Sequence, residues 1–161
     1  MATLRGWPFW LFIAFLVLLH FLLHLGIGLG ATAPDLLTVA VLLGARRLRG
    51  AQAALLGLLL GLLQDALSLM SFGAEAVTQA VLGFGGARAR DFFVGESAFF
   101  VGIYLFVGKW GHDIIFLALS RTCSGGEVLS RLLVQAPLAG VYAAGCGILA
   151  LFLYRAVTGE R

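Results

Sequence analysis

The sequence predicts an all-α integral membrane protein with six transmembrane helices, folded as a single polytopic membrane domain over residues 1–161. Hydrophobic residues make up 61% of the chain and charged residues only 12%. A soluble domain has about 25% charged residues, because polar groups must cover its surface. The mean hydropathy is +1.02, and the apolar residues are grouped in long stretches of the length that membrane helices need.

The first predicted helix covers residues 7–30 and follows Arg5. A cleaved signal peptide is the alternative interpretation, because Ala31-Thr-Ala33 resembles a small-residue cleavage site. However, the apolar run exceeds the roughly 7 to 15 residues of a signal-peptide core. We therefore predict an uncleaved membrane anchor.

The second predicted helix, residues 34–45, is too short to span a bilayer unaided. An α-helix of this length reaches only about 18 Å, whereas the hydrocarbon core is about 30 Å thick. The sequence therefore predicts a short or broken helix that borrows from the preceding loop or is shielded by other helices.

Four further predicted helices complete the domain. They cover residues 51–70, 72–87, 92–120 and 128–154, and Pro137 is expected to kink the last one.

The basic residues predict the orientation of these helices. With six spans, eight arginines lie on the side of the N-terminus and two lie on the opposite side. Because basic residues are enriched in cytoplasmic loops, both termini are expected in the cytoplasm. The eight are Arg5, Arg46, Arg47, Arg49, Arg88, Arg90, Arg155 and Arg161, the two are Arg121 and Arg131, and Lys109 falls within a span.

One face of the third predicted helix carries small and polar residues, whereas its other sides are mostly leucine. Gly57 and Gly61 form a small-xxx-small pair that lets another backbone approach closely. Asp65 is costly in a membrane unless it is paired, hydrated or protonated. We favour a hydrogen-bonding or capping role for it over partner docking, and over proton or ion transport. The face consists of Ala54, Gly57, Gly61, Gln64, Asp65 and Ser68.

The fifth predicted helix carries three ionisable residues, Lys109, His112 and Asp113. Lys109 and Asp113 are one helical turn apart and can pair with each other. Lys109 and Asp65 are expected at similar depths in the membrane. We therefore hypothesise a buried polar cluster of Asp65, Lys109, His112 and Asp113 that connects the third and fifth helices, with a structural role favoured over a catalytic one.

The remaining polar residues give weaker signals. His20 and His24 have a spacing that can hold a metal, but no third ligand is evident, so hydrogen bonding between helices is favoured. Glu75 and Gln79 begin the fourth helix, where a solvated or capping role is expected. No nucleophile–base pair, metal-ligand set or nucleic-acid-binding arm is recognisable. We predict a protein that is not an enzyme and that has no cofactor.

A succession of short motifs in the first half of the chain resembles one known family. Pro34-Asp35-Leu-Leu opens a short helix that ends in a basic turn, Gly61-Leu-Leu-Gln-Asp65 closes a glycine-rich helix, and Ser71-Phe-Gly73 precedes the next helix. This succession resembles the rod shape-determining protein MreD family over roughly residues 30–90. The positions that carry the family pattern are Pro34, Asp35, Gly57, Gly61, Asp65 and Gly73.

The resemblance implies a fold similar to the substrate-binding subunits of energy-coupling-factor vitamin transporters. It also implies a non-enzymatic scaffold subunit of the cell-elongation, peptidoglycan-synthesising machinery in the bacterial inner membrane. The implied partner is the bitopic protein MreC, which connects to MreB filaments, RodA and a penicillin-binding transpeptidase. We expect the Gly57 and Gly61 groove to receive the MreC transmembrane helix.

The alternative is a substrate-binding membrane subunit of a vitamin or small-molecule transporter. Trp110, His112, Asp113 and Glu75 would then supply polar and aromatic groups to a ligand cavity. In either case, anionic lipid is the expected partner of the basic turn at Arg46, Arg47 and Arg49, with a cytoplasmic protein as the alternative. The sequence leaves homo-oligomerisation open.

Overall fold

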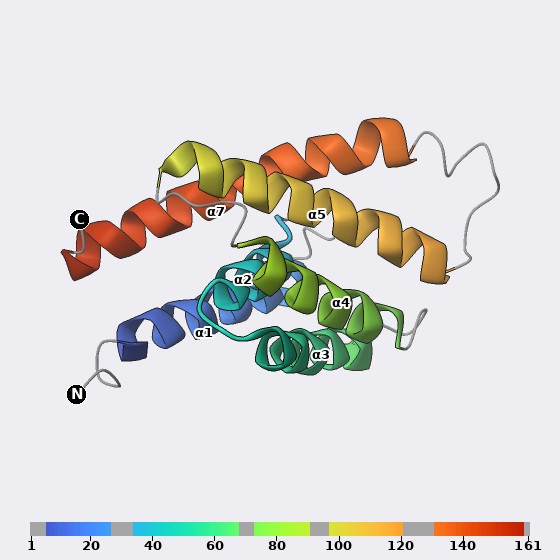
Figure 1. The fold of residues 1–161 in the computed structure, drawn as a ribbon, viewed down its shortest axis with the longest axis horizontal. Coiled ribbons are helices and arrows are strands. Elements are labelled where there is room, and N and C mark those ends of the chain that lie inside the picture. The colour runs from blue at the N-terminus through green and yellow to red at the C-terminus, as the bar shows by residue number, and fades with distance from the viewer. Residues whose placement is uncertain (1–5, 27–33, 68–72, 91–96, 121–130, 160–161) are drawn as a thin grey trace.

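The computed structural model describes residues 6–26, 34–67, 73–90, 97–120 and 131–159, and every regular element within these ranges is helical. Six α-helices and two short π-helices follow one another along the described chain (Figure 1). They are α1 (Trp7–Phe21), η2 (Leu22–Gly26), α2 (Leu36–Ala45), α3 (Gly50–Leu67), α4 (Ala74–Ala89), α5 (Ala98–Ser120), η4 (Arg131–Gln135) and α7 (Ala136–Thr158). The predicted all-α class is confirmed.

Four helical segments are long and apolar enough to cross a membrane, so the chain is a multi-pass integral membrane protein. The remaining helices are shorter: α2 has 10 residues and α4 has 16. At about 1.5 Å per residue, these two reach about 15 Å and 24 Å. Of the six predicted spans, four are therefore supported as full spans among the described residues. They are Trp7–His24, Gly50–Leu67, Ala98–Leu119 and Leu132–Thr158.

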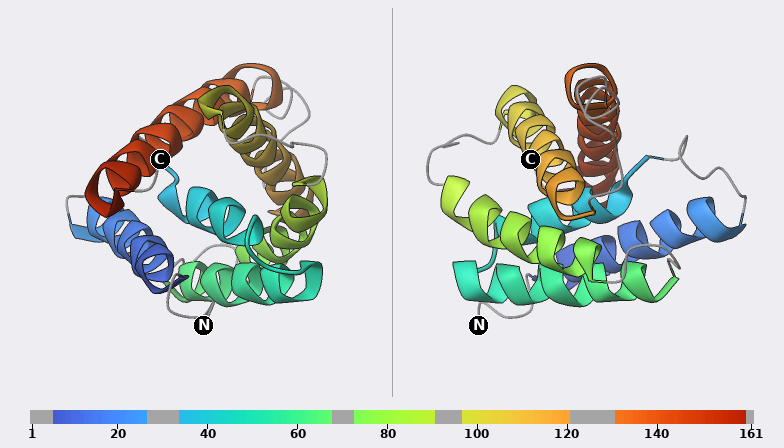
Figure 2. Two further views of the ribbon diagram at one scale, coloured as in Figure 1. Left: turned by 60° about the vertical axis from the view of Figure 1, so that its left-hand side comes forward. Right: turned by 90° about the vertical axis from the view of Figure 1, so that its right-hand side faces the viewer.

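Helix α2 lies at the centre of the bundle, and the other five α-helices surround it (Figure 2). Each of the five contacts α2, and all ten residues of α2 are buried. A helix too short to span a bilayer is tolerated where protein rather than lipid covers its ends. The enclosed position of α2 explains its shortness and confirms the prediction of a short second helix.

Hydrogen bonds from neighbouring helices hold the C-terminal end of α2. The Tyr104 hydroxyl on α5 donates to the carbonyl of Leu42 over 2.9 Å. The Arg90 guanidinium, directly after α4, donates to the carbonyls of Arg46 and Leu48 over 3.2 and 3.0 Å. The last carbonyls of a helix have no partner within the helix, so Tyr104 and Arg90 supply donors to the end of α2 and to the turn that follows it.

The helices α3 and α4 form a closely packed pair, because each presents glycine to the backbone of the other. A Cβ atom added at Gly57 would overlap the carbonyl of Gln79, and one added at Gly61 would overlap the backbone of Ala76. In the opposite direction, a Cβ atom at Gly83 would overlap a carbonyl of α3. The predicted close approach at Gly57 and Gly61 is confirmed.

The backbone that makes this approach belongs to α4 of the same chain. Gly57 and Gly61 are buried against α4 and do not line an open groove. The prediction that these two glycines receive the transmembrane helix of a partner protein is therefore wrong, because α4 already occupies that surface. The sequence periodicity identifies a face that packs against another helix, but it does not say which helix that is.

Apolar side chains cover the outside of the bundle, as expected for surfaces in contact with lipid. On α1 and η2 they recur every three or four residues, opposite the buried Phe9, Ile13, Leu16 and His20. The exposed set there is Trp7, Leu11, Phe15, Leu18 and Leu22, and on α3 it is Leu55, Leu59, Leu62, Leu63 and Leu67.

Pro137 lies in the first turn of α7, directly after the π-helix η4. We expected a kink inside the last helix, whereas the α-helix begins only at Ala136. Proline fits the first turn because an amide there has no partner within the helix.

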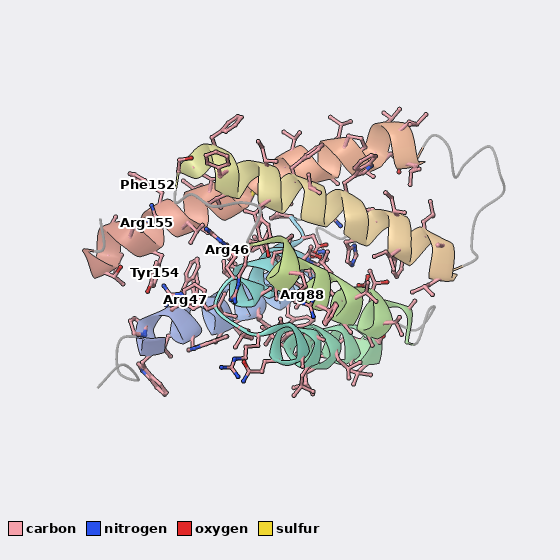
Figure 3. All side chains as sticks on the ribbon, viewed as in Figure 1. Arg46, Arg47, Arg88, Phe152, Tyr154 and Arg155 are labelled. Atoms are coloured by element: carbon pink, nitrogen blue, oxygen red, sulfur yellow. The ribbon has the colours of Figure 1, made fainter. Side chains whose placement is uncertain are left out.

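Successive helices run in alternating directions, so α1 begins and α7 ends at the same end of the bundle (Figure 1). Arg46 and Arg47, which follow α2, and Arg155, near the end of α7, also lie toward this end (Figure 3). We call it the arginine end. The N-terminus of α2 lies toward the opposite end.

Candidate functional site

Polar side chains of α2, α4 and α5 meet inside the bundle, toward the end opposite the arginines, and Lys109 is their centre. The Lys109 ammonium donates to Asp113 over 2.6 Å and to Asp35 over 2.8 Å. Lys109 is only 8% exposed, so the two carboxylates supply the interactions that water would otherwise provide. The predicted pairing of Lys109 with Asp113 is confirmed, and Asp35 is a second partner, 74 residues distant in sequence.

His112 extends this group to α4. Its Nδ1 atom lies 3.1 Å from Asp113, and its Nε2 atom lies 3.0 Å from Glu75. A ring with protons on both nitrogens can donate to both carboxylates. Glu75 lies in the first turn of α4, where the helix dipole also favours a negative charge. We call Asp35, Glu75, Lys109, His112 and Asp113 the charged network.

Asp35 also begins α2. Its carboxylate accepts hydrogen bonds from the Thr38 amide over 3.1 Å and from the Thr38 hydroxyl over 2.7 Å. The Thr38 hydroxyl in turn accepts from the Gln79 side chain over 3.0 Å. Asp35 is thus an N-cap that also binds a lysine, and it joins the central helix to α4 and α5.

Asp65 lies near the end of α3 and caps α4. Its two carboxylate oxygens accept from the backbone amides of Glu75, over 3.3 Å, and Ala76, over 2.9 Å. The expected capping or hydrogen-bonding role agrees with this arrangement. The hypothesised cluster of Asp65, Lys109, His112 and Asp113 is therefore correct for the last three residues only, because the distant partner of Lys109 is Asp35 and not Asp65. The reason is that α2 occupies the centre of the bundle and brings its own carboxylate to the lysine.

His20 and His24 take part in hydrogen bonds rather than in a shared site. The Nδ1 atom of His20 accepts from the Leu37 amide over 3.3 Å, which leaves Nε2 to donate to the Gln64 side chain over 3.0 Å. His24 Nδ1 lies 3.0 Å from the His20 carbonyl. His20 therefore connects α1 to α2 and α3, as the favoured interpretation expected. No group of three metal-ligating side chains occurs within the described ranges.

The six positions of the family pattern all lie around α2, α3 and α4. Gly73 is the N-cap of α4 and has a φ of 94°, a conformation that favours glycine. The Pro34 carbonyl accepts from the Leu36 amide just before α2. Asp35 and Asp65 cap the helices that follow them, and Gly57 and Gly61 pack on α4.

Two residues of the interior were misjudged from the sequence. Glu75 and Gln79 were expected to be solvated or capping, but both are buried. The sequence does contain a signal for this: Glu75, Gln79, Leu82, Gly83 and Gly86 recur at helical spacing and form one face of α4. That face packs into the bundle, so its polar members need protein partners.

The charged network is a set of mutually paired groups. Each of its three carboxylates lies within hydrogen-bonding distance of Lys109 or His112. Such an arrangement fixes the relative positions of α2, α4 and α5, because breaking one pair leaves a buried charge unpaired. Comparisons with protein-family models, curated proteins and solved structures found no match to this chain.

Proposed function

We propose that the chain is a non-enzymatic scaffold subunit of the bacterial cell-elongation machinery, of the MreD type. The observation that supports a scaffold is the charged network: its polar groups bind one another and so build a fixed helix arrangement. A further support is that the residues of the family pattern serve the same purpose, since they cap and pack α2, α3 and α4.

The proposed location is the inner membrane, with both termini in the cytoplasm. The gathering of Arg46, Arg47 and Arg155 at one end of the bundle supports this orientation, because basic residues are enriched on the cytoplasmic side.

The proposed partner is a bitopic membrane protein of the MreC type, through which the subunit would connect to MreB, RodA and a penicillin-binding transpeptidase. Because α4 covers Gly57 and Gly61, the partner helix must use the outward, lipid-facing side of the bundle. Association there would depend on close packing in the membrane rather than on the internal glycines.

The test is co-purification of the tagged full chain with MreC from the same organism, in mild detergent, with an unrelated bitopic protein as the control. We expect MreC to be retained and the control to be lost. In parallel, depletion of the chain should turn rod-shaped cells round. Equal recovery of both bitopic proteins, together with unchanged cell shape, would contradict the proposal.

The alternative of a vitamin-binding transporter subunit has less support. Glu75, His112 and Asp113 do lie together, but they bind one another. Trp110 is on the exposed side of α5, and its indole nitrogen lies 3.4 Å from the Leu132 carbonyl. Mass spectrometry of the purified chain distinguishes the two functions, because a transporter subunit should carry a small molecule at a stoichiometric level.

A further inference from the structure

The arginine end contains a group of stacked side chains that the proposed function does not use. The Arg47 guanidinium lies over the ring of Phe9, 3.8 Å from its centroid. The Phe9 ring makes an edge contact with Tyr154 at 6.1 Å, and Tyr154 also contacts Phe12 at 4.9 Å. We call Phe9, Phe12, Arg47 and Tyr154 the arginine–aromatic group. Figure 3 shows Arg47 and Tyr154 at this end, between α7 and α1.

Arg47 is exposed, and no described carboxylate pairs with it. All four acidic side chains that the structure describes, Asp35, Asp65, Glu75 and Asp113, belong to the charged network or cap α4. A guanidinium stacked on an aromatic ring is held in place, yet the N–H groups around its edge stay available to an anion. Arg47 is therefore positioned as a donor for a ligand from outside the chain.

A second donor in the arginine–aromatic group belongs to Tyr154, which contacts the same Phe9 ring. Tyr154 is 8% exposed, and its hydroxyl has no hydrogen-bond partner among the described residues. Most buried hydroxyl groups have a partner, and an unpaired one is unfavourable. An oxygen-rich anion next to Arg47 would bring an acceptor into this region.

The surroundings identify the class of ligand. The group lies where the membrane-crossing segments Trp7–His24 and Leu132–Thr158 begin and end, which is the depth of lipid headgroups. Exposed apolar side chains lie deeper in the same two spans, with Leu11 and Phe15 on α1 and Phe152 and Leu153 on α7. A ligand that fits both features has an anionic head and apolar chains.

We propose that the arginine–aromatic group binds the phosphate of an anionic phospholipid, with the Arg47 guanidinium as the main ligand. The acyl chains extend from there into the hydrocarbon core, which the apolar outer surface of the bundle contacts. Phosphatidylglycerol is preferred over phosphatidylcholine, because its headgroup has a net negative charge, whereas the choline cation of phosphatidylcholine is repelled by Arg47. This inference goes beyond the proposed function and does not depend on it.

The test is native mass spectrometry of the full chain in detergent, titrated with phosphatidylglycerol or with phosphatidylcholine. We expect selective binding of phosphatidylglycerol. Arg47→Gln should weaken that binding about tenfold, equivalent to about 1.4 kcal/mol. Arg49→Gln is the matched control: it removes the same charge from the same exposed turn, two residues away, at a side chain that stacks on no ring among the described residues. Its affinity should stay within about twofold of the unmodified chain, because exposed charges outside a site contribute little.

Equal losses in Arg47→Gln and Arg49→Gln would overturn the proposal, because they would indicate diffuse attraction rather than a site. Equal binding of the two lipids by the unmodified chain would overturn it as well. Displacement of phosphatidylglycerol by millimolar inorganic phosphate would assign the site to free phosphate and reject a lipid site.

A charge-conserving variant keeps the test decisive if Arg47→Gln does not fold. Arg47→Lys retains the charge but loses the flat guanidinium that stacks on Phe9 and binds phosphate through two N–H groups. We expect weaker and less selective binding of phosphatidylglycerol. Binding equal to that of the unmodified chain would show that the stacked geometry plays no part.

Discussion

Charged side chains are buried and paired at one end of the bundle and exposed at the other. In the charged network, Lys109 and His112 are buried and each contacts two carboxylates. At the arginine end, Arg47 and Arg88 are exposed and lie over aromatic rings, at 3.8 and 5.0 Å from the ring centroids. The paired charges are satisfied within the chain and define its shape. The arginines that stack on aromatic rings are held in place and face outward, where lipid or another protein can bind them.

The difference predicts unequal costs of mutation at the two ends. Removing one member of a buried ion pair leaves its partner charged and desolvated, whereas removing an exposed arginine leaves only a hydrated surface. The four predictions below test this contrast, and thermal unfolding in detergent, followed by the fluorescence of the three tryptophans, measures each of them.

The largest effect is expected for Lys109→Met. It leaves Asp35 and Asp113 without their shared cation, at a cost of about 3–5 kcal/mol. The double variant Lys109→Met/Asp35→Asn should be more stable than Lys109→Met alone, because one of the stranded charges is gone. If Lys109→Met unfolds at the same temperature as the unmodified chain, the network does not stabilise the fold.

A smaller effect is expected for Asp65→Ala. The change leaves the amides of Glu75 and Ala76 without an acceptor in a site where Asp65 is fully buried, at a cost of about 2 kcal/mol. The matched control at the other end is Gln52→Ala, which removes an exposed acceptor of the Arg49 amide and should cost about 0.5 kcal/mol or less. Similar losses at both positions would contradict the contrast between the ends.

The next prediction compares two tyrosines, one whose hydroxyl has a hydrogen-bond partner and one whose hydroxyl has none among the described residues. Tyr104→Phe removes the hydrogen bond to the Leu42 carbonyl and should cost about 1 kcal/mol. Tyr154→Phe removes a buried hydroxyl that has no described partner, so the lipid-free chain should be equally or more stable. A loss of stability in Tyr154→Phe as large as in Tyr104→Phe would show that the Tyr154 hydroxyl is paired in solution.

The smallest effect is expected for Arg47→Gln in lipid-free detergent. An exposed contact between a cation and an aromatic ring is worth about 0.5–1 kcal/mol, which sets the upper limit of the loss. Arg88→Gln, whose guanidinium lies farther from its ring, should lose less. A loss of stability in Arg47→Gln as large as that in Lys109→Met would show that Arg47 stabilises the fold as a buried residue does.

The helices and the inward face of α3 were predictable, because apolar length and helical spacing are local properties. The small-residue face of α3 is buried at Gly57, Gly61 and Asp65, as the spacing indicated. The Lys109–Asp113 pair was predictable for the same reason, since the two residues are one turn apart.

The partners of these faces were not predictable, because they depend on how helices distant in sequence are arranged. Nothing near Asp35 in the sequence points to Lys109, and the pair exists only because α2 is central. Likewise, a glycine pair such as Gly57 and Gly61 can receive any helix, and here α4 follows directly in the chain and takes that place.

The enclosed position of α2 has a consequence for biosynthesis. Helix α2 is synthesised second. Four of the five helices that surround it, α3, α4, α5 and α7, are synthesised after it. Its final surroundings do not exist until the ribosome has produced the last helix. Lipid alone does not accommodate a helix that is too short to span the bilayer and begins with an aspartate. During synthesis, α2 must therefore stay outside its final position until the later helices pack around it.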